Sequence, residues 1–312
     1  MEIIRDLQDV KDMEKTAVAL GNFDGVHLGH QELIMETVSQ AHEQDLVPVV
    51  FTFSNHPSDL IPGCEPVKNI MYDDRKAELI ESLGVDYLID VPFTEEIRDM
   101  EAEDFVKDLL VGTMNAGLAV CGFNYHFGAR AYGTSEVLEL FGDKYGFDVY
   151  EMAPFEIDGH VVSSSFIRLL ISSGLVDLVK RYLGRNYEVG GEVVVGNRLG
   201  KKLGFPTSNL NIDEQMVTPP NGVYTTFVRY GGKKYPSITN VGNKPTVGDF
   251  EKNIETHIFD FNKELYGKEI TVEFLKKMRD EKKFDSLDDL STQIVKDCEG
   301  AKAWFEEEGL NK

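Results

Sequence analysis

Short apolar segments alternate with amphipathic segments through the first half of the chain. The apolar segments have the length of buried strands and cover residues 16–20, 47–53, 85–91, 118–121 and 147–152. Apolar residues at helical spacing occupy the stretches between them, at residues 31–43, 73–83, 102–110 and 135–145. Strands that alternate with helices form βαβ units, so this half predicts a parallel sheet with helices on both faces. Ligands bind such sheets at the carboxyl ends of the strands.

The pattern changes in the second half. A long helical stretch at residues 163–183 loosens near residues 172–174 and ends at Gly184-Arg185. Short β-branched runs then follow without helices between them, at residues 192–195, 223–230, 235–241, 255–261 and 270–275. Gly231-Gly232 separates two of these runs and predicts a tight hairpin turn. Strands at this spacing are typical of a small antiparallel barrel.

We expect the chain to end in a helix. Ser286 is placed to cap it, Asp289 follows three residues later, and apolar residues continue at helical spacing. The change of pattern near residue 185 predicts two domains. Residues 1–185 are expected to form an α/β domain with a Rossmann-like parallel sheet. Residues 186–312 are expected to form a small antiparallel β-barrel with a terminal helix.

Composition and charge narrow the class of protein. With 312 residues, of which 42% are hydrophobic, the chain is long enough for two domains with cores of their own. The formal net charge of −22 repels polyanions, so no nucleic acid partner is expected. Cys64, Cys121 and Cys298 include no Cys-x-x-Cys pair, which argues against a disulfide framework and against a zinc site. No signal pattern and no apolar run of membrane-spanning length occurs, so we expect a cytoplasmic protein with no membrane partner, and homo-oligomer formation stays open.

A candidate phosphate site lies where the first apolar run ends. Residues 19–30 read Ala-Leu-Gly-Asn-Phe-Asp-Gly-Val-His-Leu-Gly-His, which predicts a strand, a glycine-rich turn and a helix start. Gly29 has no Cβ, so a phosphate can approach the backbone, and His27 and His30 flank it as hydrogen-bond donors. These features predict attack on the α-phosphate of a nucleoside triphosphate at a solvent-facing turn. The alternative is a strand-turn-helix corner with two surface histidines.

Ser163-Ser-Ser-Phe-Ile-Arg168 opens the long helix. Its hydroxyls could serve only as helix caps. The functional alternative adds Arg168, one turn inside the helix, whose planar guanidinium suits phosphate. Hydroxyls such as Ser163 and Ser164, the N-terminal amides and this guanidinium would then converge on a triphosphate.

The segment 122–128, Gly-Phe-Asn-Tyr-His-Phe-Gly, follows a predicted strand and therefore belongs on the ligand face. Asn124 could hydrogen-bond a base or a flavin ring. The aromatic residues after it, Phe127 among them, could offer a stacking surface, although aromatic side chains beside strands more often belong to the core.

A glycine-rich basic loop opens the second half. Gly196, Gly200 and Gly204 alternate there with Arg198, Lys201 and Lys202, a pattern that an ordinary surface loop would also show. Thr207 and Asn209 follow two residues apart, so on an extended segment both side chains face one way. A hydroxyl and an amide oxygen on one face suit Mg²⁺ that also holds substrate phosphates.

A carboxylate stands further along the barrel half. Glu255 begins a predicted strand, in Glu-Thr-His-Ile-Phe-Asp-Phe. A lone glutamate is usually a solvated surface charge. Beside a Mg-ATP site it becomes a candidate base for an attacking hydroxyl.

Together these motifs resemble the bacterial bifunctional riboflavin kinase/FAD synthetase (FMN adenylyltransferase) family over almost the whole chain. The first-half signatures also resemble the nucleotidyltransferase superfamily, which includes class I aminoacyl-tRNA synthetases, but the acidic charge argues against a synthetase. The matching motifs are residues 21–30, 82–87, 122–128 and 163–168 in the first half, and residues 204–209, 221–224, 240–246 and 255–261 in the second.

The family resemblance implies two reactions and a set of site residues. The barrel would phosphorylate riboflavin with ATP to give FMN, and the nucleotidyltransferase domain would adenylylate FMN to FAD, releasing pyrophosphate. The implied cofactor is Mg²⁺, with ATP as co-substrate. The expected catalytic residues are His27, His30, Arg168 and Glu255. The expected ATP-binding residues are Gly21, Phe23, Gly29, Ser163, Ser164, Gly204, Thr207 and Asn209, with Thr207 and Asn209 as ligands of Mg²⁺. The expected flavin-binding residues are Asn124, Phe127 and Arg130.

The chain departs from the family pattern at a few positions. Ser54 and Asn55 stand where the family usually has an acidic residue and a proline, and Lys201 and Lys202 stand where it usually has arginine. Two other functions stay open on sequence alone. One is a different small adenylyl- or cytidylyltransferase with an unrelated C-terminal domain, and the other is a flavin-binding sensor without catalysis.

Overall fold

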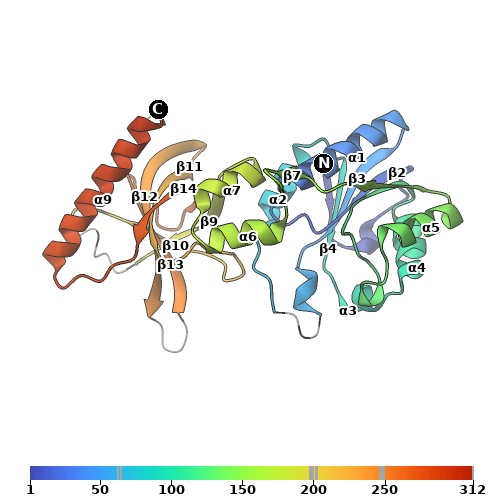
Figure 1. The fold of residues 1–312 in the computed structure, drawn as a ribbon, viewed down its shortest axis with the longest axis horizontal. Coiled ribbons are helices and arrows are strands. Elements are labelled where there is room, and N and C mark those ends of the chain that lie inside the picture. Colours follow the sequence, from blue (N-terminus) through green and yellow to red (C-terminus); the bar gives the residue numbers. More distant parts are fainter. Residues whose placement is uncertain (62, 64, 197–199, 201–202, 246–249, 311–312) are drawn as a thin grey trace. The chain divides into compact units, whose positions relative to one another are not determined.

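The computed structural model describes the whole chain except residues 62, 64, 197–199, 201–202, 246–249 and 311–312. The described chain falls into two compact units, Met1–Ser164 and Ser165–Lys312. Figure 1 shows their helices and strands, coloured from blue at the N-terminus to red at the C-terminus.

The first unit is built on a six-stranded parallel sheet in the order β1-β4-β3-β2-β5-β6. The chain runs outward from β2 to β3 and β4, then returns to the other side of β2 for β5 and β6, so the switch point lies between β2 and β5. The strands are β1 (Glu2–Ile4), β2 (Thr16–Leu20), β3 (Val47–Phe53), β4 (Tyr87–Val91), β5 (Ala116–Gly122) and β6 (Asp148–Met152).

Helices cover both faces of this sheet. They are α1 (Leu28–Glu43), α2 (Asp73–Glu81), α3 (Glu95–Asp99), α4 (Ala102–Asp104), the π-helix η3 (Phe105–Thr113) and α5 (Ser135–Tyr145). Short 3₁₀ turns lie at η1 (Leu7–Asp9), η2 (Pro57–Asp59) and η4 (Ala129–Ala131), and β7 (Glu156–Ile157) pairs with β8 (His160–Val161).

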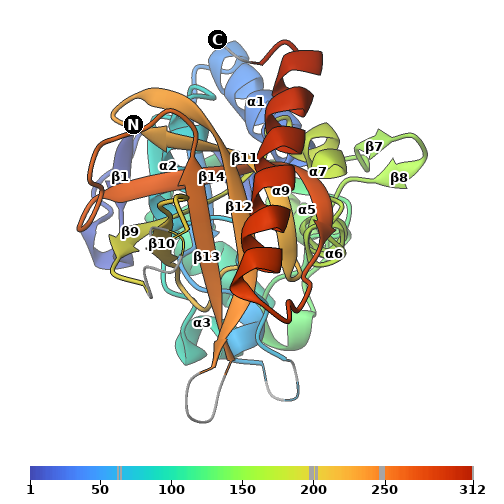
Figure 2. The same cartoon turned by 90° about the vertical axis from the view of Figure 1, so that its left-hand side faces the viewer.

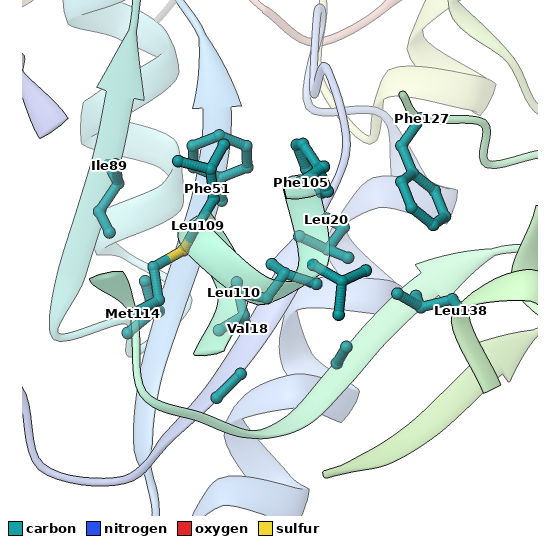
Figure 3. Close-up of a cluster of buried hydrophobic side chains, with 14 of the residues drawn as sticks. Val18, Leu20, Phe51, Ile89, Phe105, Leu109, Leu110, Met114, Phe127 and Leu138 are labelled. Atoms are coloured by element: carbon teal, nitrogen blue, oxygen red, sulfur yellow. The ribbon is translucent and has the colours of Figure 1, made fainter. Parts of the chain in front are cut away.

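Two apolar cores follow from the alternation of side chains along the strands. Val18 and Leu20 of β2 pack on one face with Phe51 of β3 and with Phe105 and other residues of η3, the cluster drawn in Figure 3. Ala17 and Ala19 point to the opposite face, toward residues of α1 and α2. A strand buried on both faces needs apolar residues at every position, which is why β2 appears in the sequence as a continuous apolar run.

The second unit contains a closed antiparallel barrel in the order β10-β13-β12-β11-β14-β9. Its strands are β9 (Tyr187–Val194), β10 (Ser208–Asn211), β11 (Gly222–Tyr230), β12 (Lys233–Pro245), β13 (Phe250–Ile258) and β14 (Glu269–Asp280). The terminal helix α9 (Leu287–Glu307) lies along β12, as Figure 2 shows, and buries Ala301 and Phe305 against the barrel. Two further helices, α6 (Ser164–Ser172) and α7 (Val176–Leu183), precede the barrel, and α7 lies against β9 and β14.

The expected fold class is confirmed: a Rossmann-like parallel sheet is followed by an antiparallel barrel and a terminal helix. Gly231 and Gly232 form the β11–β12 turn with φ values of 57° and 75°, and the Ser286 hydroxyl accepts from the Asp289 N–H at 3.1 Å. The short elements β1, α3 and β10 were not predicted. The compact units meet at Ser164/Ser165, upstream of the change of pattern, so the boundary near residue 185 stays a prediction.

A glycine inside α5 gives a stability test. Replacing glycine by alanine in a helix usually stabilises by up to about 1 kcal/mol. At Gly142, however, a Cβ would lie 2.6 Å from the Phe147 carbonyl oxygen. Overpacking of this kind costs about 1–3 kcal/mol, so Gly142→Ala should lower the unfolding temperature measured by calorimetry.

Gly300→Ala in α9 is the matched control, because the nearest atom to its Cβ would be the flexible Met278 methyl at 3.2 Å. This variant should keep or raise the unfolding temperature. Equal responses of the two variants would show that the Phe147 backbone yields and would contradict the argument.

Candidate functional sites

A cavity of about 1270 Å³ opens in the first unit where β2, β3 and β5 end. This is the switch-point edge that the fold class predicts for a ligand. Its apolar wall includes Leu20, Phe51 and Phe105, which Figure 3 labels. The cavity brings together the expected residues Gly21, Phe23, His30, Asn124, Phe127 and Arg130.

His27 is the N-cap of α1. Its Nδ1 accepts a hydrogen bond from the His30 N–H at 3.1 Å, and the two rings stack with centroids 3.5 Å apart. Because Nδ1 is the acceptor, a neutral His27 ring carries its proton on Nε2, which makes Nε2–H a donor. His27 is only 5% exposed, so the expectation of a solvent-facing turn is wrong at this residue, because capping draws the ring into the turn.

The turn between β2 and α1 holds an unusual backbone. Phe23 (φ 50°) and Val26 (φ 35°) lie in the left-handed region, where bulky and β-branched residues are rarely found, and both are fully buried. Asp24 fixes the turn between them. Both of its carboxylate oxygens accept from the Ile70 N–H, at 3.0 and 3.1 Å, and its carbonyl accepts from the Ser164 hydroxyl at 2.7 Å. Such strained backbone often marks a functional segment.

Packing of neighbouring side chains favours a glycine at position 29. A Cβ at this position would lie 3.2 Å from the Cβ of Phe155 and 3.4 Å from the His27 ring. A side chain at position 29 would therefore be crowded by protein, which is a second reason for a glycine beside the expected one, room for a phosphate. A contact of ATP with the Gly29 backbone stays a prediction.

The segment after β5 forms the opposite wall of the cavity. Asn124 is exposed there, whereas Phe127 is 6% exposed and packs on Tyr125 and Phe105 with ring centroids 5.8 and 5.2 Å apart. Phe127 thus belongs to the core and presents one side to the cavity. Arg130 is exposed, with a left-handed backbone (φ 58°) in η4. Burial raises the pKa of the Tyr125 phenol and raises that of the Cys121 thiol to about 12, so both stay protonated.

Asn55 was missed as a site-shaping residue. Its Nδ2 donates to the Phe93 carbonyl at 3.1 Å, and its Oδ1 accepts from the Phe93 N–H at 2.6 Å. The Phe93 ring then meets Phe53 edge-on at 5.0 Å, and both rings line the cavity. A proline at position 55, the usual family residue, could make neither bond. The departure from the family pattern was the only sequence signal for this role.

Ser163, Ser164 and Arg168 lie around the division between the units. Ser164 is the last residue of the first unit, and its hydroxyl donates to the Asp24 carbonyl of the β2–α1 turn. Arg168 lies in α6 within the second unit and is half-buried. Its part in an adenylyl-transfer site, like that of Ser163, stays a prediction.

Thr207 and Asn209 lie against one glycine-bearing segment of the second unit. A Cβ on Gly200 would be 3.3 Å from the Thr207 hydroxyl, and one on Gly196 would collide with the Asn209 amide. Asn209 is 4% exposed, and its Oδ1 has no hydrogen-bond partner among the described residues. Gly204 sits in the left-handed region (φ 88°). The expected basic side chains Arg198, Lys201 and Lys202 lie outside the described residues.

Glu255 lies in the middle of a row of polar side chains on the barrel's outer face. Strand pairing sets Glu255 opposite Asn209 of β10 on one side and Asn240 of β12 on the other. Cross-strand partners share a face, so these side chains form one row. The alternate residues Leu210, Ile254 and Val241 are buried inside the barrel.

A hydrogen bond connects β13, the strand that carries Glu255, to the segment that carries Thr207. The His257 ring, two residues beyond Glu255, hydrogen-bonds the Pro206 carbonyl at 2.8 Å. Among the described residues no cluster of three or more His, Cys, Asp or Glu could hold a metal ion. The Thr207 hydroxyl and the buried Asn209 Oδ1, which has no partner among the described residues, are oxygens of the kind that Mg²⁺ binds, and their role as its ligands stays a prediction.

Two family models match successive parts of the chain. The model described as FAD synthetase matches residues 9–166, and the model described as riboflavin kinase matches residues 183–305. Within the described residues, no helix has both the length and the apolar character that a membrane span requires.

Curated relatives match over nearly the whole chain. A bifunctional riboflavin kinase/FMN adenylyltransferase from Haemophilus influenzae is 34% identical and covers 98% of this chain and 99% of its own. Proteins of the same name from Bacillus subtilis (35% identical, 95% and 94% covered) and Escherichia coli (32%, 100% and 99%) agree.

A solved structure shares the same architecture. A Streptococcus pneumoniae protein described as a macrolide-efflux protein is 32% identical with a TM-score of 0.87, and the match covers 97% of this chain and 98% of that one. The efflux description is a statement about the pneumococcal protein. The two family matches and the full-length relatives show that the chain belongs to the bifunctional riboflavin kinase/FMN adenylyltransferase family.

Proposed function

We propose that this chain makes FAD from riboflavin in two steps, with riboflavin phosphorylated in the barrel and FMN adenylylated in the α/β unit. The observation that carries the proposal is the separation of the two family matches, because each covers its own candidate site residues, with Arg168 alone lying between the two matched ranges. The FAD synthetase match contains the His27–His30 turn and the cavity, and the riboflavin kinase match contains Thr207, Asn209 and Glu255.

In the adenylyl-transfer step, a phosphate oxygen of FMN attacks the α-phosphorus of ATP. The new oxygen–phosphorus bond forms as the bond to the β-phosphate bridging oxygen breaks, and pyrophosphate leaves. Negative charge builds on the α-phosphate oxygens, and His27, His30 and the N-terminus of α1 are the groups we assign to stabilise it. The aromatic wall of the cavity would hold the flavin ring.

In the kinase step, the ribityl 5′-hydroxyl of riboflavin attacks the γ-phosphorus of ATP, and ADP leaves. Glu255 would accept the hydroxyl proton as the oxygen–phosphorus bond forms. Thr207 and Asn209 would hold Mg²⁺, which when bound neutralises charge on the ATP phosphates.

The test is a product assay. The full chain is incubated with riboflavin, ATP and Mg²⁺, and riboflavin, FMN and FAD are separated by chromatography. FMN followed by FAD supports both activities. FAD from supplied FMN only would remove the kinase assignment, and flavin binding without turnover would favour the sensor alternative.

The role of His27 in adenylyl transfer can be separated from its role as a helix cap. His27→Asn keeps a capping acceptor but loses the imidazole donor, whereas His27→Ala loses both. Both variants should slow FAD formation from FMN by about a hundredfold or more. Only His27→Ala should also lower stability, by about 1 kcal/mol in a denaturant titration.

Riboflavin phosphorylation by the same variants is the internal control and should not change. A wild-type rate of FAD formation in His27→Asn would remove the imidazole from the mechanism and leave the residue as a cap.

Glu255→Gln tests the kinase base. The substitution keeps the shape of the side chain and removes the proton acceptor. Riboflavin phosphorylation should fall roughly a hundredfold to ten-thousandfold, with ATP still bound. If the only effect is weaker ATP binding, Glu255 acts through the metal and its assignment as base is wrong.

We also propose that the two activities separate near residue 185. A fragment of residues 1–185 should convert FMN to FAD and leave riboflavin unchanged, and a fragment of residues 186–312 should stop at FMN. Because α7 buries Val176, Val179 and Leu183, a barrel fragment that begins at residue 165 should unfold at a higher temperature than one that begins at residue 186. Phosphorylation of riboflavin by the first fragment would refute the assignment of reactions, and failure of all the fragments to fold would refute independent domains.

A further inference from the structure

Asn253 stands next to Glu255 on β13 and makes a short hydrogen bond to it. The residues are two apart on one strand, so their side chains leave the barrel on the same face. The Asn253 Nδ2 donates to Glu255 Oε1 at 2.6 Å. This is the one hydrogen bond that the Glu255 carboxylate makes to side chains in the described part of the chain.

The amide of Asn253 is held at one end only. The residue is 7% exposed, and its Oδ1 has no hydrogen-bond partner among the described residues. The alternative amide orientation would set Oδ1 against the Glu255 carboxylate, oxygen to oxygen, so the carboxylate itself decides which end faces it. Leaving a buried amide oxygen unpaired costs about 1–3 kcal/mol, which argues against a residue retained only for packing.

On β12, no side chain stands opposite Asn253 to compete for the hydrogen bond between its amide and Glu255. Asn253 lies opposite Gly242 of β12, which has no side chain to compete for the amide. Glu255 is flanked across the strands by Asn209 and Asn240, so Asn253 meets the carboxylate along the strand rather than across it. One carboxylate oxygen is engaged by Asn253, and the other, Oε2, is left to accept a proton.

We propose that Asn253 is a positioning residue for the kinase step: its amide fixes the rotamer of Glu255 so that Oε2 faces the attacking hydroxyl. The inference rests on the proposed role of Glu255 as base. A misplaced catalytic group can cost about a hundredfold in rate even when substrates still bind, so the expected effect lies in kcat.

The experiment uses the full chain and compares Asn253→Asp and Asn253→Ala. Asn253→Asp keeps the size and shape of the side chain but replaces the donating amide by a carboxyl that repels Glu255 when both are ionised, and Asn253→Ala removes the amide. Both should lower kcat for riboflavin phosphorylation by about tenfold to a hundredfold and leave KM for Mg-ATP unchanged. FAD formation from supplied FMN by the same samples should keep the wild-type rate, which shows that the α/β unit is intact, and the unchanged KM for Mg-ATP shows that the barrel is folded.

A double-mutant cycle separates positioning from a general structural effect. In a Glu255→Gln background there is no carboxylate to orient, so adding Asn253→Ala should cause no further loss of kcat. The matched control is Asn262→Ala, which removes an exposed amide from the loop after β13 and should leave kcat unchanged.

The outcomes distinguish this inference from the proposed function. If Glu255→Gln keeps wild-type kcat, the assignment of the base fails and the positioning role fails with it. If Glu255→Gln is slow but Asn253→Asp and Asn253→Ala are as fast as wild type, the base stands and the positioning role is refuted. An equal loss from Asn253→Ala in both backgrounds would make the residue structural and would also overturn the inference.

Discussion

The α/β unit depends on the strained turn that connects β2 to α1. Two buried residues, Phe23 and Val26, adopt left-handed backbone there, at a cost of about 1–3 kcal/mol each. The turn is held by two side chains: Asp24 accepts from the N–H of Ile70, in a distant segment, and His27 accepts from the N–H of His30 at the start of α1. Its shape sets where α1 begins, and so where the N-terminus of that helix and the His30 ring meet the cavity. A relaxed turn would keep the sheet and lose the site.

The barrel unit depends on strand register instead. Side chains alternate between the interior and the outer face, so Asn209 and Glu255 share a face only because β10 and β13 pair as they do. A slip of one residue would move Glu255 inward and carry Ile254, now fully buried, out to solvent. The buried interior thus protects the arrangement of the polar row outside it.

The sequence was most informative where structure is local. The periodicity of hydrophobic residues predicted the central strands of the sheet, and the Gly231-Gly232 pair predicted the hairpin turn. The cap residue Ser286 predicted the start of the terminal helix. None of these predictions needed knowledge of the packing. The sequence failed where a residue's role depends on a distant partner. Nothing near Gly29 in the sequence shows that Phe155 fills the space beside it, and nothing near Asn55 shows that it pairs with the backbone of Phe93.

The chain carries a formal charge of −22 and yet belongs to a family of enzymes named for kinase and adenylyltransferase activities, whose substrates include the anions ATP and FMN. Net charge acts at a distance and is screened beyond about 10 Å at 0.1 M salt, so it bears on long polyanions more than on a small ligand inside a cavity. Whether a small anionic ligand binds inside a cavity depends on the groups that line that cavity. The first unit has imidazoles and the amide groups of a helix N-terminus beside its cavity, and the second has a buried amide oxygen, Asn209 Oδ1, without a partner among the described residues. The net charge of −22 is therefore compatible with the use of ATP that the family's two activities imply.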